Sequence, residues 1–73
     1  MDKITAAQCR AARALIGISQ EELAALSHVG KRTIAKFERE HGGSTPVIRA
    51  ALRRALEQAG IAFTGGGGIE PRG

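Results

Sequence analysis

The stretch that decides the fold runs from Gln20 to Arg39 and reads QEELAALSHVGKRTIAKFER. Ser19, directly before it, and Glu22 match a capping box, in which two side chains satisfy backbone N–H groups at a helix start. The box predicts a short helix that ends at about Ser27. The residues that this helix is expected to turn inward are Leu23, Ala24 and Leu26.

A second helix is predicted directly after the first. His28-Val29-Gly30 does not readily continue a helix, and its glycine is an acceptable N-cap for a helix from Lys31 to about Glu40. Ile34 and Phe37 fall on one side of that helix. The opposite side carries Arg32, Ala35, Lys36 and Arg39. We therefore expect two helices joined by a tight turn, the second with an apolar inner face and a cationic outer face.

A helix is also predicted before this pair. Thr5 and Gln8 match another capping box, and the helix that it opens ends at Ile16, where Gly17 accepts the left-handed conformation of a helix end. Four residues share one side of this helix: Cys9, Ala12, Arg13 and Ile16. An arginine therefore lies at the edge of a buried face.

A fourth helix is predicted with Thr45 as its N-cap, Pro46 in its first turn and Gly60 at its end. Its apolar stripe is formed by Ile48, Ala51, Leu52, Ala55, Leu56 and Ala59. Three arginines lie outside the stripe: Arg49, Arg53 and Arg54.

The last segment, residues 61–73, reads IAFTGGGGIEPRG and has four consecutive glycines between two short β-prone pieces. Glycine loses the most backbone entropy on ordering, and two strands alone are marginally stable in water. The segment is therefore a flexible tail or a weak hairpin that orders against a partner. Of a disordered end and a dimerising strand, this entropy favours the disordered end.

Composition bounds the size and chemistry of the molecule. The 73 residues carry 11 Lys and Arg against 7 Asp and Glu, a net charge of +4 that favours an anionic partner. Phe37 and Phe63 are the only aromatic residues, so the core rests on Ala, Leu, Ile and Val, which suits packed helices. A single domain of this size rarely has room for an enzyme cleft.

Cysteine content and hydropathy indicate the cellular compartment of the protein. Cys9 is the only cysteine, so neither an intramolecular disulfide nor a four-cysteine zinc site can form, and its place on the inner face of the first helix predicts a buried structural thiol. The sequence has no run of signal-peptide type and no apolar stretch of about 18 residues. We therefore expect a soluble, cytoplasmic protein without a membrane segment.

The two central helices match a helix-turn-helix, in which the second helix enters the major groove of double-stranded DNA. Outward Arg and Lys side chains then donate to N7 and O6 of guanine. We expect base contacts from Lys31, Arg32 and Lys36. We expect phosphate contacts from Gln20, Thr33 and Arg39, with Gln20 at a helix start whose free N–H groups favour an anion. The three arginines of the fourth helix could contact flanking phosphates or only keep that helix soluble, and both interpretations stay open.

Residues Arg13 to Glu38 resemble the phage repressor/Cro (Xre) helix-turn-helix family, and with the first and fourth helices the resemblance covers about residues 5–60. The matching positions are Arg13, Gly17, Ser19-Gln20-Glu21-Glu22-Leu23-Ala24, Val29, Ile34 and Glu38. The resemblance implies an all-α, lambda-repressor-like DNA-binding domain of four helices over residues 1–60. It also implies the same base contacts, a phosphate contact at Gln20 and an ion pair of Arg13 with Glu38 inside the domain.

The sequence departs from that family in two places. His28 stands where the family commonly has glycine, because the turn needs a positive φ, so some backbone strain is expected there. A helix after the fourth is missing or reduced to the glycine-rich segment. Since that region often carries dimer contacts in relatives, the mode of self-association stays open.

Other kinds of site find little support. His28 and His41 have no acidic or cysteine companions at ligand spacing, so we expect no metal site. No catalytic signature is present, and Gly65 to Gly68 lacks the Lys-Ser/Thr pair of a phosphate-binding loop, so we expect neither an enzyme nor a cofactor.

The sequence therefore predicts a sequence-specific transcriptional regulator, acting as a repressor and as a homodimer on a pseudo-palindromic operator. A second hypothesis is a protein-interaction module of the same fold, such as an antiactivator or an antitoxin-like partner of another regulator. Glu38 and Glu40 temper the cationic helix and keep this alternative open.

Overall fold

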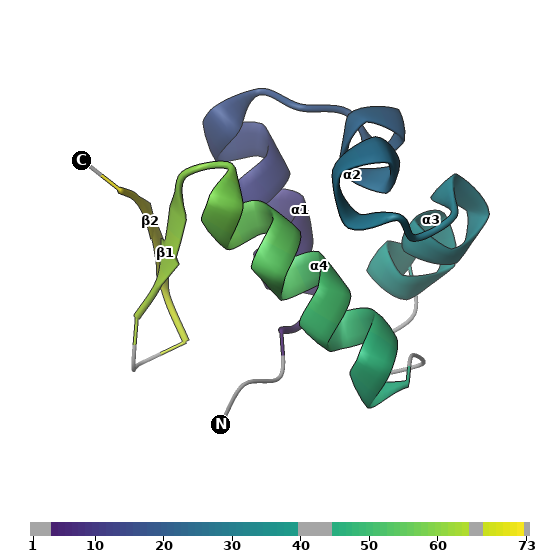
Figure 1. Cartoon of the computed structure of the whole chain (residues 1–73). Helices are drawn as coiled ribbons and strands as arrows, with labels where there is room; N and C mark the ends of the chain where they lie inside the picture. Colours follow the sequence, from purple (N-terminus) through teal and green to yellow (C-terminus); the bar gives the residue numbers. More distant parts are fainter. Residues whose placement is uncertain (1–3, 40–44, 65–66, 73) are drawn as a thin grey trace.

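Four helices and a short hairpin form the part of the chain that the structure, a computed structural model, describes: residues 4–39, 45–64 and 67–72 (Figure 1). The elements are α1 (Ala6–Ile16), α2 (Gln20–Ser27), α3 (Lys31–Arg39), α4 (Pro46–Gln58), β1 (Ile61–Phe63) and β2 (Ile69–Pro71). The predicted helix end at Glu40, the loop from His41 to Ser44, and Gly65 and Gly66 lie outside the described residues. No helix in the described ranges is long and apolar enough to cross a membrane.

The helix starts are fixed by their caps, as the sequence predicted. At α1, the hydroxyl of Thr5 accepts from the backbone N–H of Gln8 at 3.1 Å, and the side chain of Gln8 accepts from the backbone N–H of Thr5 at 2.9 Å. Ser19 and Glu22 form the same reciprocal pair at α2, at 3.0 and 2.8 Å. Each box satisfies N–H groups that a helix start leaves without partners.

The left-handed conformations also lie at the predicted positions. Gly17 ends α1 with a φ of 72°, and His28 ends α2 with a φ of 61°. His28 is the only non-glycine residue with a positive φ in the described chain. Its Cβ makes that conformation unfavourable, so the turn between α2 and α3 holds backbone strain.

The core lies where the inner faces of the helices meet. Figure 1 shows α2 and α3 on one side of the molecule and the hairpin on the other, with α1 and α4 between them. The buried cluster consists of Ile4, Cys9, Ala12, Leu23, Val29, Ile34, Phe37, Leu52, Ala55, Leu56 and Ile61. The turn and α3 are therefore anchored from inside by Val29, Ile34 and Phe37.

Two residues predicted to face the core, Leu26 and Ala59, are exposed. Leu26 is 50% exposed, and the side chains that α2 turns toward the core are Leu23, Ala24 and Ser27. Leu26 lies about 110° from the centre of that arc on the helix surface. It borders a shallow groove between α2 and α4 instead. Ala59, predicted in the stripe of α4, is also exposed, since the helix ends at Gln58 and Ala59 is its C-cap.

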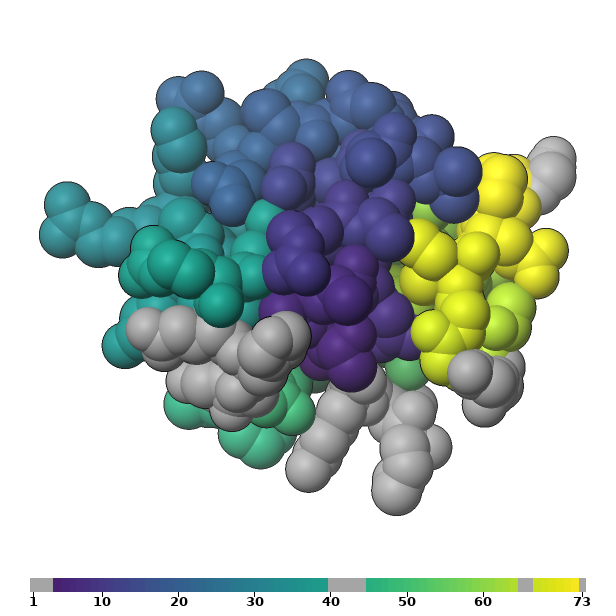
Figure 2. Space-filling model, turned by 180° about the vertical axis from the view of Figure 1, so that it is seen from behind, coloured from purple at the N-terminus to yellow at the C-terminus, as the bar shows by residue number. Residues whose placement is uncertain are grey.

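The C-terminal segment forms a hairpin, so the disordered end that the sequence favoured is not what residues 61–64 and 67–72 show. β1 and β2 are antiparallel, with Ala62 opposite Glu70. Ile61 is fully buried, and Figure 2 shows residues 67–72 (yellow) against α1 (purple). The side-chain amide of Gln8 donates to the carbonyl of Gly67 at 2.7 Å. Docking on α1 and α4 supplies the apolar contacts that an isolated hairpin lacks.

Candidate nucleic-acid interface

Helix α3 is divided into a buried and an exposed side. Ile34 and Phe37 are 0 and 1% exposed and hold the helix against the core. The exposed residues are Lys31, Arg32, Thr33, Lys36 and Arg39. All five residues that the sequence assigned to DNA on this helix therefore face solvent.

Arg13 and Glu38 are in contact, which joins α1 to α3. Arg13 Nε lies 2.8 Å from Glu38 Oε2, and Arg13 Nη2 lies 2.7 Å from Glu38 Oε1, a bidentate pair. The Glu38 side chain is 3% exposed and that of Arg13 is 19% exposed. Arg13 Nη1 also donates to the carbonyl of Ile18 at 3.2 Å, which fixes the chain before α2.

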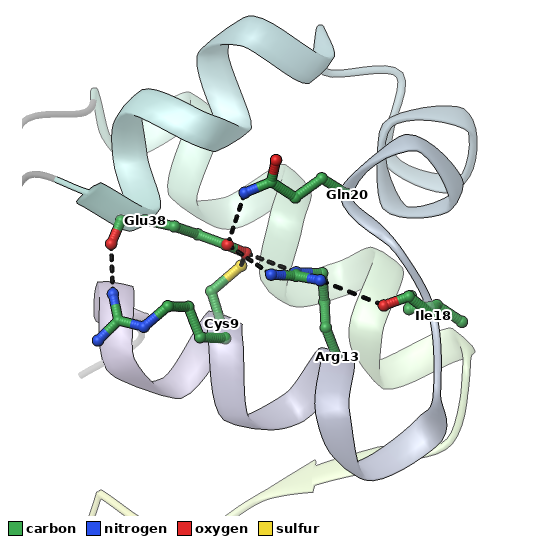
Figure 3. Close-up of polar contacts among 6 residues, drawn as sticks. Cys9, Arg13, Ile18, Gln20 and Glu38 are labelled. Carbon is green, nitrogen blue, oxygen red and sulfur yellow. Dashed lines mark hydrogen bonds and ion pairs between the residues drawn. The ribbon is translucent and has the colours of Figure 1, made fainter.

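Two more side chains converge on the same carboxylate (Figure 3). Gln20 Nε2 donates to Glu38 Oε1 at 2.9 Å, and Cys9 Sγ donates to Glu38 Oε2 at 3.1 Å. One carboxylate therefore accepts hydrogen bonds from α1 and from the first residue of α2. Because it lies on α3, this network sets the position of α3 relative to both helices.

The pKa shifts follow from this geometry. Burial raises the pKa of Glu38, but hydrogen bonds from Arg13, Gln20 and Cys9 outweigh it, so the pKa lies below its usual value. The hydrogen bond to Glu38 raises the pKa of Arg13 against the effect of burial. Burial, and next the hydrogen bond to Glu38, raise the pKa of the Cys9 thiol well above its usual range. Cys9 therefore stays protonated and acts as a donor.

The position of Gln20 differs from the role predicted for its side chain. The sequence predicted a phosphate contact for this side chain, whereas one of its two amide hydrogens is bound to Glu38. The second amide hydrogen and the backbone N–H at the start of α2 are the donors left for an anion. Sequence reasoning missed this contact because Gln20 and Glu38 are 18 residues apart.

Arg10 is a residue that sequence reasoning missed altogether. Its Nη1 donates to the backbone carbonyl of Glu38, in the last turn of α3. The spacing in the sequence could have indicated this contact, because Arg10 precedes Arg13 by three residues and so lies on nearly the same side of α1.

The arginines of α4 do not behave alike. Arg53 Nε lies 3.1 Å from Glu57 Oε2, and its guanidinium lies 4.8 Å from the ring centre of Phe63 in β1. Arg53 is thus held against the hairpin, on the side of the molecule away from α3. Arg54 is exposed and Arg49 is half-buried.

The next feature is the set of side chains that could bind a metal ion. No group of three or more His, Cys, Asp or Glu side chains that could hold an ion occurs in residues 4–39, 45–64 and 67–72. His28 lies alone at the turn, and His41 is outside the described residues.

The sequence matches a known protein family. A family model described as "Helix-turn-helix" matches residues 10–47, a little over half of the chain, from within α1 to the start of α4. No curated protein matches the sequence.

Proposed function

Since the chain belongs to the helix-turn-helix family, a family of DNA-binding domains rather than of enzymes, we propose that it is a sequence-specific transcriptional regulator of the phage repressor/Cro (Xre) type. In this proposal α3 enters the major groove, and the protein acts in the cytoplasm as a repressor that occludes a promoter.

The observation that carries the proposal is the division of α3. A helix with side chains fits the major groove, and its exposed side then faces base edges. Lys31, Arg32 and Lys36 would read bases, each bidentate contact being worth about 1–3 kcal/mol of discrimination. The phosphate contacts would be Gln20, Thr33 and Arg39.

A homodimer follows from the small number of base contacts. Three side chains per domain give limited discrimination among the many competing sites of a genome. A two-fold symmetric pair doubles the contacts and matches a pseudo-palindromic operator, with half-sites about 34–36 Å apart.

The proposal is tested by selecting bound duplexes from a random pool and sequencing them. We expect a palindromic motif for the wild type, and loss of preference at single positions for Lys31→Ala, Arg32→Ala and Lys36→Ala. Arg72→Ala is the matched control, because it removes one exposed cation from the hairpin. A pool without enrichment, or equal motifs for all four variants, would contradict the proposal.

A protein-interaction module of the same fold is the second candidate. It is favoured by three exposed large apolar side chains outside α3: Leu15 at 48%, Leu26 at 50% and Val47 at 77%. Such a module, an antiactivator or an antitoxin-like partner, predicts co-purification with a protein and no sequence-selective retention of DNA. Leu26→Ser would then abolish the protein complex, whereas a DNA-binding regulator would keep its selected motif with this substitution.

A further inference from the structure

We propose that Arg10 of α1 is a phosphate-binding residue of the DNA interface, placed at the C-terminal end of the recognition helix α3. The proposal rests on the function proposed above and adds to it a contact from outside the helix-turn-helix pair.

The position of Arg10 is set by α3 itself. Its side chain reaches from α1 across to α3, where Nη1 donates to the backbone carbonyl of Glu38. Glu38 precedes Arg39, the exposed cation at the end of the helix. Arg10 is exposed, so its guanidinium lies at the surface beside the last turn of α3.

The C-terminal end of α3 favours a nearby cation. The last carbonyls of a helix carry a partial negative charge equivalent to about −0.5 of an elementary charge, which repels phosphate. Glu38 adds a full negative charge at the same place, and Arg13 compensates it with a bidentate contact. Arg10 covers the carbonyl of the same residue. Together the two arginines turn a helix end that would repel DNA into one that attracts it.

The guanidinium of Arg10 also has N–H donors that the contact with Glu38 does not use. It carries five N–H donors in a fixed fork, suited to the paired oxygens of a phosphate. Among the described residues, its side chain makes one hydrogen bond, to the carbonyl of Glu38. Most of the fork is therefore available to a phosphate.

Gln20 lies on the same flank of α3. Its amide contacts the carboxylate of Glu38, while Arg10 contacts the carbonyl of that residue. One DNA strand passing this flank would meet the start of α2 and then Arg10. Thr33 lies elsewhere around α3, more than 100° from Glu38 on the helix surface, and would serve the opposite strand.

The test compares Arg10→Gln, Arg10→Lys and the control Arg72→Gln for binding to a duplex of random sequence and to the selected operator, over a series of salt concentrations. We expect Arg10→Gln to weaken both complexes equally, by about five- to tenfold at low salt, and to reduce the salt slope by about 1. Arg10→Lys keeps the charge and restores the slope, and Arg72→Gln leaves it unchanged.

Two results would overturn the inference in different ways. An unchanged salt slope for Arg10→Gln, together with a lower free energy of unfolding, would reduce Arg10 to a structural cap of α3. Wild-type protein that binds neither duplex at low salt would overturn the proposed function itself, which the variants alone cannot do. Circular dichroism of each variant checks that its helices are intact.

Discussion

At the scale of single residues, Glu38 is the centre of the hydrogen-bond network that joins α1, α2 and α3. Its carboxylate accepts hydrogen bonds from Arg13, Gln20 and Cys9, and its carbonyl accepts one from Arg10. A buried carboxylate is unfavourable unless its oxygens are paired, and here each oxygen has two donors. The sequence predicted the Arg13 partner through the family resemblance, but it could not predict the other three, which are 18 to 29 residues away.

Replacing Glu38 by glutamine should lower the free energy of unfolding by about 3 kcal/mol, because it leaves Arg13 without its counter-charge. The value lies at the low end of the range for buried pairs, since Arg13 keeps 19% exposure. Urea denaturation measures it. The control is Glu57→Gln, which removes the more exposed pair with Arg53 and should cost at most about 0.5 kcal/mol. Equal losses in the two variants would contradict the prediction.

The lowered pKa of Glu38 makes part of the stability depend on pH. A carboxyl whose pKa is lower in the folded state stabilises the fold fully above its unfolded pKa of about 4.3. The contribution is lost as pH falls from there through the folded pKa. The stability difference between wild type and Glu38→Gln should therefore shrink below about pH 4. Denaturation curves at several pH values check this, and a difference constant with pH would count against it.

At the scale of elements, local sequence was a reliable guide to the helices. The capping boxes at Thr5 and Ser19 and the left-handed residues Gly17 and His28 all involve groups within four positions of one another. Leu26 and the hairpin were misjudged because their environment is set by α4 and α1, which no local pattern specifies.

Replacing His28 by glycine should stabilise the protein. Relief of the left-handed conformation gains about 1–2 kcal/mol, and the extra entropy of glycine in the unfolded chain costs about 0.4–1 kcal/mol, so the net gain is about 0.8 kcal/mol. Gly17→Ala is the reciprocal control. A Cβ there meets nothing within 4 Å, so no steric clash contributes, and the expected loss of about 1 kcal/mol is the φ strain less the entropy that alanine removes from the unfolded chain. Thermal denaturation that shows a lower midpoint for His28→Gly would refute the interpretation of the turn.

The hairpin should contribute to global stability through Ile61. This side chain is fully buried in the core, so Ile61→Ala should lower the free energy of unfolding by about 3 kcal/mol. Glu70→Ala, on the exposed side of β2, should change it by less than about 0.5 kcal/mol. Chemical denaturation of both variants measures these changes. If Ile61→Ala lowered the free energy of unfolding as little as the control does, the hairpin would not belong to the core.

At the scale of the whole molecule, α3 lies on the side opposite the hairpin (Figure 1). On the hairpin side Arg53 forms an ion pair with Glu57, whereas the cations of α3 are exposed, so the net charge of +4 is unevenly distributed. The exposed cations of α3 and Arg10 face the proposed DNA, and the hairpin side is left for other contacts.

A dimer on a palindrome predicts a strict dependence on half-site spacing. Inserting about half a helical turn, roughly 5 base pairs, rotates one half-site to the far side of the duplex. Affinity for that duplex should fall to that of a single half-site. Fluorescence anisotropy measures it, and a duplex with a full turn inserted is the control for length. Equal affinity for the original and half-turn spacings would show that the domains bind independently.

The sequence by itself determined the four helices, their caps, the strained turn and the two faces of α3. These depend on interactions within one or two turns of chain, which the order of residues specifies directly. Only the tertiary structure decided which partners the polar side chains contact. Gln20 contacts Glu38, Arg53 contacts Phe63, and Arg10 contacts the end of α3. It also ordered the glycine-rich segment, because the packed surface of α1 and α4 offsets an entropy cost that a two-stranded hairpin does not meet alone.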